Sequence, residues 1–585
     1  MSRVLNDLPA FLSALEAEGL LQRVSVEVDP FLEITEITTR VVKAGGPALL
    51  FERVKGSPYP VAINLFGTAR RMEIALGRPP AEIGEELFNA AKDFFPPSPA
   101  TLWRQRELLM RATKMPPKKV SGGPVTEITE PPNLDPWPIL TCWPKDGGRF
   151  FTLPLVITQN PAGKSNVGMY RLHTYDKSTT GMHMQIERGG GAHYAEWEAL
   201  NKPMPVVVAL GGDPISLLAS ILPLPENMDE FAFAGFLRGK SVPLVQLSNG
   251  IQAPANAEFL LEGHIPSGER RQEGPFGDHF GHYSHAAPYP VFHIQKVHRR
   301  KNPIYLATVV GIPPQEDKFM GNAINEMLIP LLRAMRPELV NLWTYQEAGF
   351  HNLAVASVNQ RYAKEGIKTA LGLMGQGQMS LSKCVVLVDP KVNVRNFSEV
   401  LDALRDNFDP AEDFILLPGT AQDTLDFTSF KMNLGSKMIL DATRGKKTPD
   451  RKPVPSEGPG PDGTILRSRN LRDSLLVVQV KGNGRAVVER LVKDPSLAGF
   501  TLIAAVSDDV PLDDEERLIW GLFTRFDCAR DLHPASSRIE GAWPKISGPL
   551  GIDATWKPGY PEPLVMTPEI IQRVDTRWKE YGIVL

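Results

Sequence analysis

The sequence is poor in cysteine. Its 585 residues include only three, Cys142, Cys384 and Cys528, and these lie far apart. Metal sites built from cysteine need close pairs such as Cys-x-x-Cys, and small secreted scaffolds need many disulfides. The composition therefore excludes a cysteine-built metal site. It predicts a protein of a reducing compartment, with the cytoplasm as the expected location.

Excess charge of one sign and long apolar runs are also missing. Lysine and arginine total 64 against 67 aspartate and glutamate, which gives a net charge of -3, and the basic residues are scattered. Nucleic acid is therefore not an expected partner. No apolar run approaches the roughly 20 residues that span a bilayer, and residues 1–9 lack the pattern of a secretory signal. Only a peripheral association with a membrane is left open.

Several common catalytic motifs are absent as well. The sequence has no Gly-x-Ser-x-Gly elbow, no His-Glu-x-x-His helix and no Cys-x-x-Cys pair, which disfavours a serine hydrolase, a zinc peptidase and a redox dithiol. Hydrophobic residues at 42% and charged residues at 22% are ordinary for a globular protein. The length predicts about three or four domains.

Proline clusters and changes in the hydrophobic pattern divide the chain into segments. The predicted segments are 1–118, 119–320, 321–445, 446–465 and 466–585. We expect α/β structure in the first, third and last, a β-rich domain with an antiparallel sheet or barrel in the second, and a flexible Pro/Gly-rich loop in the fourth.

Apolar periodicity and turn residues predict individual elements within these segments. The predicted helices are 8–18 with Asp7 as its cap, 33–43, 102–115 and 322–335. The predicted strands are 24–28, 48–51, 155–157, 206–210, 244–247, 259–261 and 383–389.

Two stretches of the C-terminal half resemble each other. Residues 408–413, Phe-Asp-Pro-Ala-Glu-Asp, are followed by Leu-Asp-Ala-Thr at 440–443. Residues 526–531, Phe-Asp-Cys-Ala-Arg-Asp, are followed by Ile-Asp-Ala-Thr at 552–555. Each pair of stretches follows a strand pattern and a helix pattern, so we predict two related α/β units.

The most unusual stretch is 273–283, which places two carboxylates among glycines. Pro275 restricts one φ angle, while Gly274 and Gly277 can take positive φ, so the backbone can bend and bring Glu273 close to Asp278. Two carboxylates in one pocket acquire different proton affinities, as acid and base catalysis requires. A polar surface turn with a helix cap is the alternative interpretation.

A second polar group suggests a cation beside a phosphate. Asn166, Glu187 and Glu230 offer the oxygen ligands that Mg²⁺ or Mn²⁺ prefers. Gly189, the first of three consecutive glycines, and Arg188 would suit a phosphate. Caps and surface groups are the alternative for these residues.

Four further side chains are candidates for the same site. Arg171 could hold a substrate carboxylate or Glu273, and Lys437 could meet a phosphate or a flavin edge. His183 and His193 flank the polar group, but isolated histidines in a β-rich domain are more often structural.

Several short words of the sequence stand in one order that resembles a known family. They are 28–30 with 32–37, 45–52, 64–68, 141–144, 232–235, 273–275 and 434–438. Over residues 6–443 the chain resembles the UbiD-type reversible decarboxylases, whose cofactor is prenylated flavin mononucleotide (prenylated FMN). The resemblance implies an N-terminal α/β domain, a central split β-barrel that binds the flavin, and a C-terminal α/β domain that assembles a homodimer or homohexamer.

The resemblance also implies roles for single residues. It implies catalytic roles for Arg171, Glu273 and Asp278, and Mn²⁺ or Mg²⁺ ligation by Asn166 and Glu230. Glu187 stands where the family usually has a histidine ligand. The implied cofactor contacts are Asn166, Met169, Tyr170, Arg171, Arg188, Gly189 and Lys437. The backbone of Ala219, Ser220 and Leu222 falls where relatives hold K⁺.

The function implied is non-oxidative decarboxylation of an aromatic or α,β-unsaturated acid. Losing CO₂ from an sp² carbon needs an electron sink that amino-acid side chains do not supply. The resemblance further implies dependence on a flavin prenyltransferase and a substrate such as a 4-hydroxybenzoate-type acid of ubiquinone or menaquinone biosynthesis. Carboxylation in the reverse direction and non-catalytic binding of prenylated flavin are the alternatives.

Overall fold

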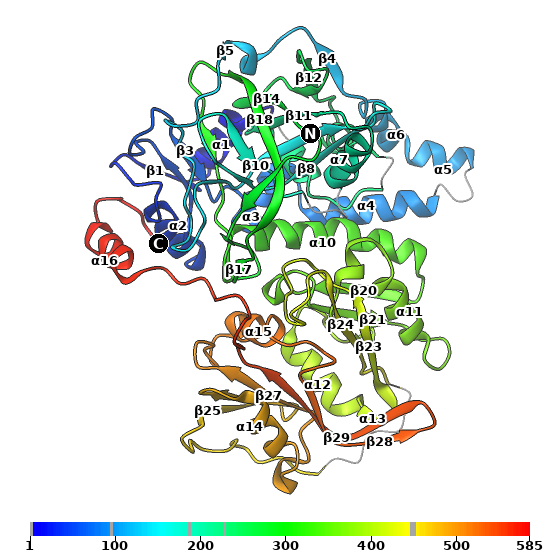
Figure 1. Cartoon of the computed structure of the whole chain (residues 1–585). Helices are drawn as coiled ribbons and strands as arrows, with labels where there is room; N and C mark the ends of the chain where they lie inside the picture. The colour runs from blue at the N-terminus through cyan, green and yellow to red at the C-terminus, as the bar shows by residue number, and fades with distance from the viewer. Residues whose placement is uncertain (1–3, 94–97, 185–188, 226–227, 445–451) are drawn as a thin grey trace. The chain divides into compact units, whose positions relative to one another are not determined.

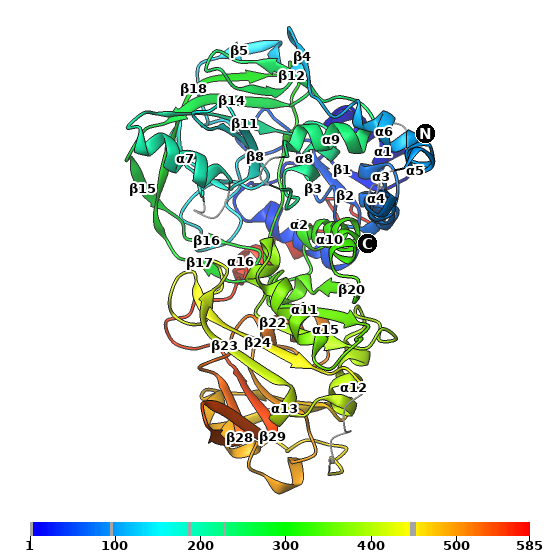
Figure 2. The ribbon, with the colours of Figure 1, turned by 90° about the vertical axis from the view of Figure 1, so that its right-hand side faces the viewer.

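The structure is a computed structural model that describes residues 4–93, 98–184, 189–225, 228–444 and 452–585. The chain forms two compact units, which are visible in Figures 1 and 2. Unit 1 comprises residues 1–278, 282–324 and 563–585, and unit 2 comprises residues 279–281 and 325–562. The chain therefore passes between the units several times, and its last segment belongs to the same unit as its first.

The N-terminal part of unit 1 is α/β, as predicted. Its elements are α1 (Leu8–Ala17), β1 (Leu21–Val24), α2 (Glu33–Lys43), β2 (Ala48–Phe51), β3 (Val61–Ile63), α3 (Ala69–Leu76), α4 (Pro80–Asp93), α5 (Pro99–Arg104) and α6 (Arg106–Ala112). Asp7 caps α1, since its side chain accepts a hydrogen bond of 3.0 Å from the backbone N of Ala10. The predicted limits of α2 and β2 are confirmed.

Two predictions for this part were wrong in extent. The strand predicted at 24–28 ends at Val24, and Val28 forms only an isolated bridge to Val54 because the chain turns at Asp29 and Pro30. The helix predicted at 102–115 is two short helices, α5 and α6. Ser98 caps α5 and Pro99 occupies its first position, so the helical stretch begins earlier than its apolar pattern suggested.

The central part of unit 1 is built on an antiparallel sheet, in the order β10-β18-β14-β11-β7-β8. These strands are β10 (Thr179–Gly181), β18 (Ala287–Arg299), β14 (Phe259–Ile265), β11 (Met204–Leu210), β7 (Leu155–Gln159) and β8 (Ser165–Met169). The predicted antiparallel arrangement is confirmed, and closure into a split barrel stays a prediction. The long strand β18 also pairs with β15 (Arg270–Glu273), which brings the unusual stretch to the sheet.

Smaller elements complete this part of unit 1. They are β4 (Lys118–Val120), β5 (Ile128–Glu130), β6 (Phe150–Phe151), β9 (Leu172–His173), α7 (Gly189–Ala199), α8 (Pro214–Ala219), α9 (Glu230–Arg238), β12 (Pro243–Gln246), β13 (Gln252–Pro254), β16 (Phe276–Gly277), β17 (Tyr283–Ser284) and β19 (Tyr305–Leu306). The strand β19 pairs with β3, so the N-terminal and central parts share a sheet.

Unit 1 is completed by the C-terminal helix α16 (Pro568–Arg577). This helix packs against α2, where the hydroxyl of Tyr581 donates a 2.7 Å hydrogen bond to Glu33 and Arg40 pairs with Asp575 at 2.5 Å. Within the described residues, none of the helices combines the length and apolar character needed to cross a bilayer.

Unit 2 contains two sheets of the same design. The first module, defined here as residues 339–441, comprises β20 (Leu339–Thr344), β21 (Leu353–Val358), α11 (Glu365–Met374), β22 (Cys384–Val388), α12 (Phe397–Asn407), α13 (Pro410–Asp413), β23 (Phe414–Ala421) and β24 (Leu434–Asp441). Its sheet has the order β20-β21-β22-β24-β23, with a parallel centre and antiparallel edges. The helix α10 (Glu316–Met335), which precedes it, begins before the predicted residue 322.

The second module, residues 465–554, repeats this plan. It comprises β25 (Ile465–Leu471), β26 (Leu475–Val480), α14 (Gly484–Leu491), β27 (Leu502–Ser507), α15 (Glu515–Phe523), β28 (Leu532–Glu540) and β29 (Trp543–Ala554). The order β25-β26-β27-β29-β28 has the same pattern of parallel and antiparallel pairs as the first module. The segment 446–465 is described only from residue 452, so the predicted flexible loop lies partly outside the described residues.

Candidate active site

The predicted catalytic trio lies together in unit 1, around the guanidinium of Arg171. Nε and Nη2 of this arginine donate to the two oxygens of Glu273 at 2.8 and 3.0 Å. Nη1 donates to Asp278, and Nη2 also donates to Ser284 at 2.9 Å. The guanidinium lies 4.8 Å from the ring centroid of Phe276. One buried cation therefore holds both carboxylates of the unusual stretch.

The local backbone explains how these carboxylates meet. Glu273 is the last residue of β15 and points into the protein, with its side chain 0% exposed. Gly274 follows with φ of 86°, as the sequence suggested. Gly277 is not among the residues with positive φ. It is needed because a Cβ there would lie 2.2 Å from the ring of Trp143.

The charges of the trio determine its protonation. Burial raises the pKa of Glu273, but the Arg171 guanidinium and a hydrogen bond from His183 outweigh it and hold the pKa at about 2. Burial also opposes the charge of Arg171, yet the two carboxylates keep its pKa above the usual range. Glu273 is thus ionised at neutral pH. Asp278, with 12% of its side chain exposed, is the more accessible carboxylate.

His183 is part of this cluster, which sequence reasoning did not establish. Its Nδ1 lies 3.2 Å from Glu273 Oε2. Burial and the nearby Arg171 lower the pKa of His183, so the ring is neutral at pH 7. Because Glu273 is an anion, Nδ1 carries the proton and Nε2 keeps its lone pair. Among the described residues, nothing hydrogen-bonds this buried Nε2.

A loop before β6 holds the acidic stretch in place. Asp146 Oδ1 accepts a 2.8 Å hydrogen bond from the backbone N of Gly277, and Oδ2 accepts from the backbone of Cys142 and Trp143 at 2.9 Å each. Burial outweighs these donors and raises the pKa of Asp146 to about 7. In the sequence, only the Asp-Gly-Gly turn at 146–148 pointed to this role of Asp146. The structure explains the first glycine, because Gly147 lies too close to the carbonyl of Gly274 to carry a Cβ.

The predicted cofactor group lies along β8 and the start of α7. A Cβ on Gly189 would lie 1.9 Å from Asn166 Oδ1, so the helix begins directly against this asparagine. The backbone N of Gly190 donates a 3.1 Å hydrogen bond to the hydroxyl of Tyr170. Glu230 Oε2 accepts from the backbone N of Val167, the residue after Asn166, at 3.0 Å. Asn166, Tyr170, Gly189 and Glu230 are therefore neighbours, with Met169 at the end of β8.

These residues suit a phosphate and a divalent cation. A glycine-rich helix N-terminus binds anions through free backbone N–H groups. Burial raises the pKa of Glu230 to about 7, because it outweighs the backbone hydrogen bond from Val167 and the charge of Lys164. The described residues contain no group of three His, Cys, Asp or Glu side chains placed to hold a metal. The predicted ligand Glu187 and the predicted phosphate contact Arg188 lie outside the described residues.

The remaining predicted residues have other surroundings. Lys437 lies in unit 2, and its ammonium donates to Ser380 O, Ser382 O and Gln422 Oε1 at 2.7, 3.0 and 3.3 Å. His193 pairs with Thr158 at 2.9 Å, as expected for a structural histidine.

The three backbone positions expected to hold K⁺ lie at the end of α8. The carbonyl oxygens of Ala219 and Leu222 already accept hydrogen bonds from Leu222 N and Leu224 N, at 3.3 and 2.8 Å. Ser220 is the C-terminal cap of the same helix.

Three family models match the chain. Models of the N-terminal, Rift-related and C-terminal domains of 3-octaprenyl-4-hydroxybenzoate carboxy-lyase, UbiD, match residues 12–91, 118–313 and 318–442. Together they cover more than half of the chain. The chain belongs to the UbiD family. Members of this family are carboxy-lyases, so the expected enzyme class is confirmed.

UbiD relatives of two lengths match the chain. An uncharacterized protein of Chlamydia trachomatis is 40% identical over 98% of this chain and 99% of its own length. A Chlamydia pneumoniae protein, named as one of the subunits of a 4-hydroxybenzoate decarboxylase, is 38% identical over 97% of both. A protein of Archaeoglobus fulgidus is 45% identical over 75% of this chain and 92% of its own length.

Solved UbiD structures match the shorter length. Vanillic acid decarboxylase of Sedimentibacter hydroxybenzoicus, in its closed form, has a TM-score of 0.67 and 27% identity over 78% of this chain and 97% of its own. An evolved dimeric form of the UbiD-class enzyme HmfF from Pelotomaculum thermopropionicum, in complex with prenylated FMN, has a TM-score of 0.63 and 27% identity over 77% and 97%.

Proposed function

We propose that this UbiD protein uses prenylated FMN to remove CO₂ from an aromatic or α,β-unsaturated carboxylic acid. The observation that carries the proposal is the buried cluster of Arg171, Glu273 and Asp278, with two carboxylates on one guanidinium. The HmfF relative binds prenylated FMN, and the Sedimentibacter relative is a decarboxylase of vanillic acid, an aromatic acid. When bound, prenylated FMN supplies the electron sink that decarboxylation at an sp² carbon needs.

Within this proposal the two carboxylates have different tasks. Glu273 accepts hydrogen bonds from Arg171 and His183, and its pKa is about 2. It therefore carries no proton to donate at neutral pH and serves to position the guanidinium. Asp278 accepts from Nη1 of Arg171 and is partly exposed, so it is the carboxylate that a substrate can reach. We assign to Asp278 the delivery of a proton to the carbon that loses CO₂.

The basic and neutral groups would orient the substrate. Arg171 remains charged throughout, so it would attract the substrate carboxylate. The lone pair on Nε2 of His183 can accept a hydrogen bond from a hydroxyl or a protonated carboxyl.

The cofactor would be held beside this cluster by residues on β8, α7 and α9. The start of α7 at Gly189 and the side chain of Asn166 would bind its phosphate. Glu230 and Asn166 would share a Mn²⁺ or Mg²⁺ ion with that phosphate. We also propose cofactor contacts at Met169, Tyr170, Arg188 and Lys437. A K⁺ site at the backbone of residues 219–222 is proposed as well.

A finer proposal concerns the pathway. The 4-hydroxybenzoate name of the Chlamydia pneumoniae relative, and the octaprenyl acid in the family description, support a quinone-precursor acid as substrate. This assignment implies dependence on a flavin prenyltransferase. Carboxylation is the same reaction in reverse and would use the same groups.

The test begins with protein produced together with a flavin prenyltransferase. We expect an absorbance spectrum of bound modified flavin, CO₂ release from at least one 4-hydroxybenzoate-type or acrylic acid, and exchange of ¹³CO₂ into that acid. Glu273→Gln should keep the flavin spectrum and lose turnover, whereas Glu198→Gln, on an exposed pair with Arg270, should keep both. Flavin binding without exchange into any acid would indicate a non-catalytic binder. An active Glu273→Gln variant would remove Glu273 from the mechanism.

A further inference from the structure

The two modules of unit 2 share side-chain bonding as well as strand order. In the first module the backbone N of Asp409 donates to Asp413 at 3.0 Å, and in the second that of Asp527 donates to Asp531 at 2.8 Å. Each sheet then ends in Asp-Ala-Thr, where the threonine hydroxyl donates to the aspartate at 2.6 Å. The repeated words of the sequence therefore occupy equivalent places in two equivalent folds.

The modules also contact each other in a reciprocal way. In one contact, α15 of the second module lies against the β20–β21 connection of the first, where Asn352 Nδ2 donates to the carbonyl of Phe523 at 3.0 Å. In the matching contact, α12 of the first module meets the β25–β26 turn of the second, where Arg472 pairs with Asp402 at 2.5 Å. The helix α12 has the same place in the first module that α15 has in the second.

A second pair of contacts is reciprocal in the same sense. Glu412, in the Asp409–Asp413 turn of the first module, pairs with Lys545 on β29 of the second at 3.0 Å. The equivalent turn of the second module reaches β24 of the first, where the hydroxyl of Ser436 donates to Asp527 at 2.7 Å. The strands β24 and β29 are equivalent, so each module offers the same surface to the other.

A self-complementary contact of this kind is the mark of a two-fold dimer of identical subunits. We infer that the second module fills, within one chain, the place that the C-terminal module of a second copy would take, so that this face of the first module is closed to other copies. UbiD relatives of two lengths agree with this inference. The Chlamydia trachomatis relative spans 98% of the chain, whereas the Archaeoglobus fulgidus relative spans 75% of it and 92% of its own length.

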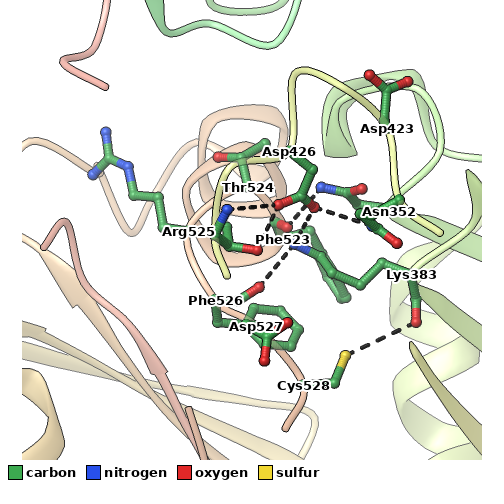
Figure 3. Close-up of polar contacts among 12 residues, drawn as sticks. Asn352, Lys383, Asp423, Asp426, Phe523, Thr524, Arg525, Phe526, Asp527 and Cys528 are labelled. Carbon is green, nitrogen blue, oxygen red and sulfur yellow. Dashed lines mark hydrogen bonds and ion pairs between the residues drawn. The ribbon is translucent and has the colours of Figure 1, made fainter. Parts of the chain in front are cut away.

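The contact made by Lys383 is not symmetric, which suits a permanent partner in the same chain. Figure 3 shows Lys383 between Asp426 and the second module. Its ammonium pairs with Asp426 and donates to the carbonyl of Phe526, both at 2.8 Å, and its side chain is 1% exposed. Cys528 Sγ lies 3.9 Å from the carbonyl of Lys383. The equivalent position in the second module, just before β27, is Thr501. Threonine has no ammonium, so the second module cannot make the same contact to the first.

Cross-linking within mixed populations of the full-length protein tests the inference. Chains labelled with ¹⁴N and ¹⁵N are unfolded, mixed, refolded and treated with a carbodiimide, which joins an ammonium to a carboxylate only when the two touch. We expect a link between Lys545 and Glu412 in which both peptides carry the same isotope. Links from Lys545 to Glu540, 3.3 Å away in the same hairpin, report that the lysine reacts. Lys545→Gln should remove both links.

Two outcomes would overturn the internal packing. If about half of the Lys545–Glu412 links join unlike isotopes, the contact lies between chains. If Lys545 links to Glu540 but not to Glu412, the modules do not meet at this surface. The idea of replacement has its own test in sedimentation of the Archaeoglobus fulgidus relative, which we expect to pair through its C-terminal module. A monomer there would contradict replacement, whatever the activity of either protein.

Discussion

Each unit contains a buried ion cluster, and the two clusters differ in what surrounds the charges. In unit 1 one guanidinium, Arg171, meets two carboxylates, Glu273 and Asp278, and one of these is partly exposed. In unit 2 one ammonium, Lys383, meets one carboxylate, Asp426, and both side chains are almost fully enclosed. The first cluster therefore has one carboxylate more than it has cations, whereas the second has one of each.

This difference separates a reactive cluster from a structural one. Burying an ion pair costs desolvation, and a fully satisfied pair that nothing can reach serves only to fix a packing arrangement. The first cluster instead has a second carboxylate that is partly exposed, and Nε2 of His183 has no hydrogen-bond partner among the described residues, so this cluster has capacity for a ligand. Burial of charge alone therefore does not identify an active site in this protein.

The strongest test of this contrast is one substitution made in both clusters. Asp278→Asn should lower turnover by about 10²- to 10⁴-fold because the proton donor is lost. Asp426→Asn should leave turnover of the folded enzyme within about twofold. Steady-state CO₂ release, normalised to bound flavin, measures both. Equal losses in the two variants would contradict the assignment of roles.

Removing the cation of the structural cluster should reveal its contribution to stability. Lys383→Met leaves Asp426 buried without its partner, which should cost unit 2 about 3–5 kcal/mol. Hydrogen exchange of peptides from β22, followed against denaturant, measures this loss. The double variant Lys383→Met/Asp426→Leu should recover most of it, and no recovery would mean that the ammonium acts through its bond to Phe526.

The reactive cluster should instead affect the free energy of unfolding at low pH. The pKa of Glu273 is about 2 when folded, below its ordinary value of 4.5, so the carboxylate stabilises the fold above about pH 4.5 and loses this effect as the pH falls toward 2. The shift corresponds to about 3 kcal/mol. Denaturant unfolding between pH 5.5 and pH 3, in wild type and Glu273→Gln, should show a steeper loss in wild type, whereas parallel curves would contradict the shifted pKa.

The smallest expected effect concerns the support of the reactive cluster. Asp146→Asn replaces one acceptor oxygen by an amide, which leaves a buried backbone N–H without a partner and should cost about 1–3 kcal/mol. The pKa of Asp146 is raised to about 7, so its ionisation destabilises wild type as the pH rises from about 4 to above 7. Stability measured across this range should fall in wild type and stay flatter in the variant. An unchanged slope would show that Asp146 is ionised throughout.

The sequence predicted those parts of the protein that depend on local pattern. Asp7 and the apolar spacing after it predicted α1, and Gly274 predicted the bend of the backbone after Glu273. His183 could not be placed in advance. It reaches Glu273, 90 residues away, only because β10 and β15 both pair with β18.

Side-chain surroundings set the other limit on prediction. The sequence does not show whether the ammonium of Lys437 contacts a cofactor or protein oxygens. In the structure it donates to three oxygens of its own unit. Asp146 accepts hydrogen bonds from backbone N–H groups, which every residue except proline possesses. Its partner Gly277 could therefore not be identified from the sequence. The repeat of the C-terminal half was recognisable because aspartates recur at the turns of both modules.

The passage of the chain at 278–282 has a mechanical consequence. Asp278 is the last residue of unit 1 before His279, Phe280 and Gly281, which belong to unit 2. Phe280 is anchored there, since its carbonyl accepts a 3.0 Å hydrogen bond from the indole of Trp520 on α15. The proposed proton donor is thus joined to unit 2 by one peptide bond and to the anchored Phe280 by two, whereas Glu273 lies five residues earlier in the chain. The backbone on either side of Asp278 is therefore held within a different unit, at Gly277 by Asp146 in unit 1 and at Phe280 by Trp520 in unit 2.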